Sequence, residues 1–171
     1  MAAFKVKALG ISLLTAAGAL VVSSVCAAGY TPAGSFTIGP VPAALSYVGT
    51  TVTCHLTFYV NIPSTTGSGT IYNVVFTQGV GDSSLCPAVT ANNLPWIVAA
   101  PTSAIGPNNV TITGVSITAP NVFAACTGSV EGNLNGSGDF SFGGTLHNGA
   151  IACGVSNGAA IWSTGRVATY P

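Results

Sequence analysis

Two serine motifs come closest to catalytic spacing in this chain. Residues 154–158 read G-V-S-N-G and match the G-x-S-x-G pattern of a nucleophile elbow around Ser156, while residues 81–85 read G-D-S-S-L and resemble the G-D-S-L hydrolases. An elbow needs a helix after its serine and an acid and a histidine further along, yet Asp139 and His147 both precede Ser156. The second motif has no D-x-x-H partner later in the chain. We therefore expect a hairpin turn, not a helix, after Ser156, and we interpret residues 81–85 as an acidic, serine-rich turn; we expect no enzyme and no catalytic residues.

The two histidines, His55 and His147, are the other candidates for acid–base or metal chemistry. Each falls on the polar side of a predicted strand, where a solvated histidine is the ordinary case. A shared acid–base or metal site would need a third ligand, and the chain has only three carboxylates to supply one. We therefore expect no metal and no cofactor.

The cysteines indicate disulfide bonds in an exported protein. Cys26 lies near the N-terminus, where a serine three positions earlier and a valine directly before it do not fit a lipidation signal. The other four form an even set with no C-x-x-C spacing, which disfavours zinc. Four cysteines allow three pairings. We favour the one that joins neighbours in order, Cys54 with Cys86 and Cys126 with Cys153.

The N-terminus resembles a secretory leader. Lys5 and Lys7 precede an uncharged apolar run at residues 8–22, and small residues follow it. The run is too short to serve comfortably as a membrane anchor and has no stop-transfer flank. We expect residues 1–28 to be a cleaved signal peptide and residues 29–171 to be a single secreted domain.

Removal of the leader would leave very little charge. Arg166 would remain against Asp82, Glu131 and Asp139, which gives a formal charge near −2. An ordinary soluble domain is about one quarter charged. Nucleic-acid binding is excluded because nothing could neutralise phosphates. A surface of Thr, Ser, Asn, Gly and some apolar side chains repels itself weakly, so it associates readily with itself or with an apolar phase.

Hydrophobic periodicity predicts strands throughout the mature chain. Residues 51–62 alternate apolar and polar side chains, while residues 71–77 are apolar on both parities, which predicts a strand covered on both sides. Residues 110–119 switch parity at Gly114, as a β-bulge requires. Residues 28–42 are predicted to form an entry segment that ends at a Gly-Pro pair. The fold class is therefore all-β, a single antiparallel β-sandwich or barrel-like domain.

One hairpin can be predicted to the level of its register. Residues 126–134 and 140–146 both alternate, and a loop at residues 135–139 places both apolar sets on one face. A loop shorter by two residues would leave two glycines opposite each other. The longer loop instead places large side chains over glycines. It predicts these pairs: Leu134 with Phe140, Gly132 with Phe142, Val130 with Gly144 and Gly128 with Leu146.

Trp96 lies in a short predicted strand at residues 94–99. The primary interpretation is a core anchor. The alternative is a residue that contacts an apolar ligand.

A series of short motifs is similar to one known family. In order they are Cys54 ahead of a Thr-rich strand, Leu94-Pro95-Trp96, the run GVSITAP at residues 114–120, the run CTGSV at residues 126–130, Gly144-Thr145-Leu146 and Cys153. Together they resemble the alkane-oxidation protein activator (PraB-type) family of small secreted bacterial proteins. The resemblance covers about residues 36–155, and residues 158–171 lie outside it. It brings no catalytic residues to this chain.

The resemblance implies an exported protein that helps a Gram-negative cell use long-chain alkanes, by wetting or emulsifying them at the cell surface. Its expected partner is then a long-chain alkane or another apolar phase. The alternative is a self-assembling extracellular fibre or biofilm-matrix subunit, whose partner is another copy of itself.

Overall fold

The computed structural model describes residues 29–31, 33–63, 67–100, 108–134, 140–157, 162–164 and 168–170. The predicted signal peptide and the hairpin loop at residues 135–139 lie outside the described residues. Within the described ranges, no helix is long and apolar enough to cross a membrane.

The described residues form strands and a single short 3-10 helix, η1 (Cys86–Ala88). The strands are β1 (Gly29–Thr31), β2 (Gly34–Tyr47), β3 (Thr50–Ile62), β4 (Gly69–Thr77), β5 (Thr90–Ala91), β6 (Trp96–Val98), β7 (Asn108–Ala119), β8 (Phe123–Leu134), β9 (Phe140–Asn148), β10 (Ile151–Asn157), β11 (Trp162–Thr164) and β12 (Ala168–Tyr170).

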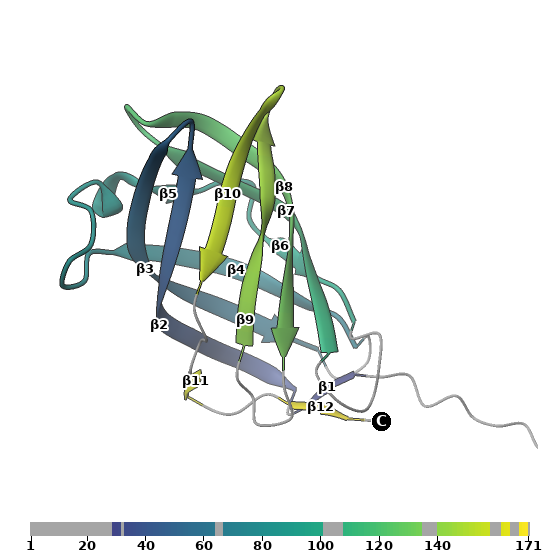
Figure 1. Ribbon diagram of the computed structural model, residues 1–171. Coiled ribbons are helices and arrows are strands. Elements are labelled where there is room, and N and C mark those ends of the chain that lie inside the picture. The colour runs from purple at the N-terminus through teal and green to yellow at the C-terminus, as the bar shows by residue number, and fades with distance from the viewer. Residues whose placement is uncertain are drawn as a thin grey trace, which may run out of the picture.

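Eight of these strands close into an antiparallel barrel in the order β10-β9-β8-β7-β6-β4-β3-β2 (Figure 1). Closure comes from β2 and β10, which pair from Tyr47 with Cys153 to Ala43 with Asn157. The sequence left a sandwich and a barrel open, and the structure has the barrel. Below the closure, β11 takes over as the partner of β2, while β1 and β12 form a separate two-stranded sheet.

Alternation along the strands sends apolar side chains into the barrel and polar ones outward. In β3 the buried set begins at Val52 and ends at Ile62, while the intervening threonines, Thr53 and Thr57, are partly exposed. The predicted bulge is confirmed: the register of β7 against β8 shifts between Ile112 and Val115, and Gly114 has φ +75°. That left-handed backbone is easily adopted by glycine.

Two predictions for individual strands are wrong. The N-terminal segment does not end at Gly39-Pro40, because β2 continues to Tyr47 through a register shift between Ile38 and Val41. Pro40 is exposed, so the bulge accommodates it without breaking the strand. The strand at residues 71–77 is not covered on both sides, since Tyr72 and Val75 on β4 are exposed.

The predicted register of the β8–β9 hairpin is confirmed. Gly132 lies opposite Phe142 and Leu134 opposite Phe140, as the five-residue loop requires. The side chain of Leu146 packs against Gly128, and that of Val130 against Gly144.

The predicted disulfide pairing is also confirmed. Cys54 is bonded to Cys86, with the two Cα atoms 5.5 Å apart, and Cys126 is bonded to Cys153, with the Cα atoms 6.3 Å apart. The first bridge ties β3 to η1 and the second ties β8 to β10, so both fasten the barrel wall.

Candidate functional site

A long connection, residues 78–95, joins β4 to β6, and we refer to it as the strap. β6 has only three residues, which pair with Gly69–Ile71 of β4 and with Ile112 and Thr113 of β7. The rest of β4 and the C-terminal part of β7 therefore have no part of β6 between them. The strap contains η1 and β5, and β5 pairs with the upper part of β7. The backbone N–H of Asn92 in the strap donates to Ser116 O of β7 at 2.8 Å. The strap therefore completes the wall where β6 is too short.

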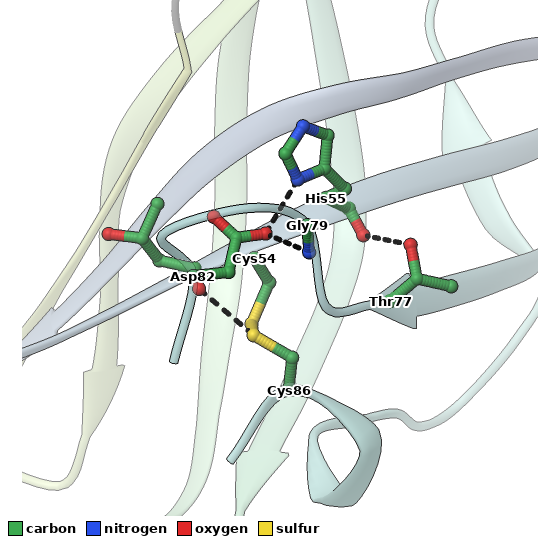
Figure 2. Close-up of polar contacts among 7 residues, drawn as sticks. Cys54, His55, Thr77, Gly79, Asp82 and Cys86 are labelled. Atoms are coloured by element: carbon green, nitrogen blue, oxygen red, sulfur yellow. Dashed lines mark hydrogen bonds and ion pairs between the residues drawn. A yellow bond between two sulfur atoms is a disulfide. The ribbon is translucent and has the colours of Figure 1, made fainter. Parts of the chain in front are cut away.

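An ion-pair geometry holds the other end of the strap to β3 (Figure 2). His55 Nδ1 lies 2.5 Å from Asp82 Oδ2, and the Gly79 N–H donates to the same oxygen at 2.7 Å. The Asp82 side chain is only 4% exposed, while that of His55 is 30% exposed. The neighbouring Cys54–Cys86 bridge anchors the same segment covalently.

These contacts determine the charge of Asp82. The hydrogen bond from the His55 side chain, followed by that from the Gly79 N–H, holds the pKa of Asp82 below its ordinary 3.8. Asp82 is therefore ionised at neutral pH, and a carboxylate only accepts hydrogen bonds. The hydrogen in the contact with His55 then sits on Nδ1, which donates to Asp82 Oδ2.

A histidine oriented by a carboxylate supplies two of the three members of a catalytic triad. Whether the His55–Asp82 pair could activate a nucleophile therefore depends on where the serines lie. Ser83 Oγ accepts the Leu85 N–H at 3.2 Å and so supports the turn that precedes η1. Ser156 lies inside β10, paired with Ala44 of β2 and Gly143 of β9. Neither serine occupies a strand-to-helix elbow. We therefore assign the His55–Asp82 pair a structural role, in which it fastens the strap to β3, and we call this pair the clasp.

The remaining predicted site residues lie apart from this clasp. His147 is exposed on β9 opposite Thr127. Trp96 is buried, and its Nε1–H donates to Asn92 O at 2.8 Å. Its ring therefore anchors the strap to the core and is out of reach of an apolar phase outside the barrel. Among the described residues, no group of three or more His, Cys, Asp or Glu side chains could hold a metal ion.

In the part of the chain that the structure describes, the barrel interior around Trp96 is filled by apolar side chains. A cavity of about 10 Å³ remains between Leu56, Trp96, Ile112, Val130 and Phe142, with other apolar neighbours. A space of that size holds roughly one water molecule, whereas small-molecule pockets measure about 300–1,000 Å³. This part of the interior is a core and has no room for a hydrocarbon chain.

Exposed large apolar side chains lie both on the barrel wall, at Tyr72 and Val75 of β4 and Ile97 of β6, and on turns at one end of the barrel. The β2–β3 turn carries Val48, which is 71% exposed, and Ile151 at the start of β10 is 42% exposed. The strap exposes Val80 and Leu85.

The clasp was missed by reasoning from sequence, which treated His55 as a surface histidine and residues 81–85 as an acidic turn. A signal for it was present. Cys54 directly precedes His55, and Cys86 follows Asp82 by four residues, so the predicted bridge itself brings the two side chains together.

A model of the family described as alkane oxidation protein activator PraA/PraB-like matches residues 3–169. The match extends beyond the range of the sequence resemblance and includes most of residues 158–171. No match was found among curated proteins or solved structures.

Proposed function

Since the chain belongs to the PraA/PraB-like family of alkane oxidation protein activators, we propose that it is a secreted, non-catalytic accessory protein that promotes bacterial use of long-chain alkanes. It acts by contact between its outer surface and the apolar phase, which it wets or emulsifies at the cell surface of a Gram-negative bacterium.

The observation that carries this proposal is the packed core of the described barrel. A carrier would need an internal pocket, but the apolar cavity at the centre of the described core measures about 10 Å³. A protein of this family with a packed interior meets alkane on its outside. The outer face suits this role because its strands present mostly threonine, serine, asparagine and glycine, with few charges to hold a hydration layer.

The proposed export rests on two features. One is the apolar, lysine-led N-terminus, and the other is a pair of buried disulfides, which persist in oxidising compartments. The non-catalytic role agrees with the activator in the family description and with the structural positions of Ser83 and Ser156.

Drop tensiometry on a hexadecane–water interface tests the proposal directly. The purified mature protein should lower the interfacial tension and stabilise a hexadecane emulsion more than an equal mass of serum albumin. A strain that lacks the gene should grow more slowly on hexadecane and normally on succinate. Tension and emulsion stability no better than those of albumin would reject the mechanism.

A second candidate function, a self-assembling fibre or matrix subunit, is favoured by the β1–β12 pair. Gly29–Thr31 pair with Ala168–Tyr170 outside the barrel, and such a short terminal pair can form between copies as easily as within one. Negative-stain microscopy of concentrated protein distinguishes the two. Filaments would support the second function, and a monomer that persists for days would reject it.

A further inference from the structure

Three turns lie at the same end of the barrel (Figure 1), and each carries or adjoins an apolar residue. They are the β2–β3, β7–β8 and β9–β10 turns. Cys153 pairs with Tyr47, so the start of β10 lies beside the β2–β3 turn. The rings of Tyr47 and Phe123 are 5.4 Å apart, which brings the β7–β8 turn to the same place. We call Val48, Val122 and Ile151, backed by these two rings, the tip cluster.

Val48 is in a conformation that does not suit it. Its φ is +44° and that of Gly49 is +79°, as in a two-residue turn in which both central residues are left-handed. Asn-Gly is the preferred pair for such a turn, whereas the β2–β3 turn has Val48-Gly49. A β-branched residue at positive φ is strained.

The strain at Val48 has no compensation within the fold. The side chain is 71% exposed, so it adds little to the core. Strained residues persist where they serve a function that the surrounding structure supports. An exposed, strained valine at the tip of a hairpin therefore indicates a contact made outside the molecule.

The charge at this end identifies the kind of surface that it contacts. None of the three turns contains an acidic or basic residue, and among the His, Lys, Arg, Asp and Glu side chains the nearest in sequence is His147, beside the β9–β10 turn. An anionic phospholipid surface attracts basic residues, which these turns lack. Binding to an uncharged hydrocarbon requires no charged side chain, because it is driven by the burial of apolar surface.

We propose that the tip cluster is the part of the protein that enters the alkane phase, with the barrel standing on the interface by its three turns. This inference rests on the proposed function and adds the location and the orientation of the contact.

Val48→Asn provides a test in which stability and function change in opposite directions. Asparagine suits the left-handed position, so the Tm should rise. The lost burial of one valine in alkane, about 1.5 kcal/mol, should weaken adsorption to a hexadecane–water interface about tenfold. Because the variant folds better than the parent, lost adsorption cannot be ascribed to unfolding.

Ile151→Thr and Ile97→Thr form a matched pair that tests whether the tip cluster or the barrel wall contacts the alkane. Ile151 is 42% exposed in the tip cluster, and Ile97 is 46% exposed on the barrel wall at β6. Ile151→Thr should weaken adsorption, and Ile97→Thr should leave it unchanged. Equal losses from the two variants, or a Val48→Asn protein that adsorbs like the parent, would overturn the proposed location.

Further measurements separate the other occupants. Stronger binding to phosphatidylglycerol vesicles than to hexadecane would also overturn the proposed alkane contact. So would a Val48→Asn variant that changes only the self-association of the protein, measured by analytical ultracentrifugation. A parent protein that does not adsorb to hexadecane at all would reject the proposed function as well, whereas adsorption that both tip variants retain rejects the tip cluster alone.

Discussion

The ring of Phe140 lies over Gly132, although the residue directly opposite Gly132 in the β8–β9 ladder is Phe142. A Cβ on residue 132 would collide with the Phe140 ring and lie 2.8 Å from Ser141 O. The Phe142 ring is stacked beside that of Phe140 at 5.8 Å and meets Phe58 of β3 edge-on at 5.3 Å. The glycine is thus covered from the diagonal position, and the opposed phenylalanine packs inside the barrel.

Gly132→Ala should therefore destabilise the protein although glycine is a poor strand residue. The added methyl group meets both a buried ring and the backbone of β9, and overpacking of this kind costs about 1–3 kcal/mol. Urea unfolding measures it. Gly143→Ala on the same hairpin is the control, because its Cβ would come no nearer than 3.3 Å to another atom. Equal losses of stability would show that the diagonal packing is misassigned.

Phe142→Ala should remove the ring that joins β9 to β3 through the interior. Phe142 is buried, and truncation of a buried aromatic residue costs about 3–5 kcal/mol. Thermal and urea unfolding should agree on this loss. Ser141→Ala, at the adjacent and less buried position, should cost less than about 0.5 kcal/mol. A Phe142→Ala protein as stable as Ser141→Ala would contradict the packing described.

Acid should weaken the clasp between the strap and β3. The folded-state pKa of Asp82 lies below the ordinary 3.8, so its contribution to stability is fully present above that value. The contribution is lost as the pH falls through the lowered folded-state pKa. At pH 5 the Asp82→Asn variant should have a lower Tm than the parent, and the difference should shrink toward pH 2.

Glu131→Gln serves as the control for this titration, because Glu131 is exposed on β8. Its Tm should follow that of the parent across the same pH range. A gap between Asp82→Asn and the parent that stays constant from pH 5 to pH 2 would show that the carboxylate charge does not contribute.

The two disulfides should stabilise the fold by similar amounts. Their sequence separations are 32 and 27 residues, and loop-closure entropy for such lengths corresponds to about 3–4 kcal/mol for each bridge. Replacement of either pair by alanines should lower the free energy of unfolding accordingly. Non-reducing peptide mapping of the parent should recover Cys54 with Cys86 and Cys126 with Cys153, and a Cys54–Cys153 peptide would refute the topology.

Sequence reasoning succeeded where the determinants are local. The β8–β9 register follows from parity across one loop, and the bulge in β7 follows from a change of parity at Gly114. It did not reach the closure of the barrel, because β2 and β10 are separated by about a hundred residues and no local pattern specifies their pairing. It also ended β2 too early, since two prolines disguised a strand that passes through a bulge.

The candidate surfaces were predictable only in part. Low charge indicated an affinity for apolar phases, but it does not say which side chains are exposed. Trp96, the residue singled out as a possible apolar contact, is buried, while Val48 stands out only once its backbone angle is known. The His55–Asp82 clasp could have been predicted from the Cys54–Cys86 bridge, but the inference requires the bridge first and the two neighbouring side chains second.

The pairing of β1 with β12 has a practical consequence for measurement. Gly29 and Tyr170 are cross-strand partners, and the pair lies at the end of the barrel away from the β2–β3 and β9–β10 turns (Figure 1). A dye or a surface anchor joined to either strand is therefore held at the same pole of the molecule. On an oil droplet with the turns inserted, a dye at that pole would remain accessible to quenchers dissolved in the water, and one placed at residue 49 would not.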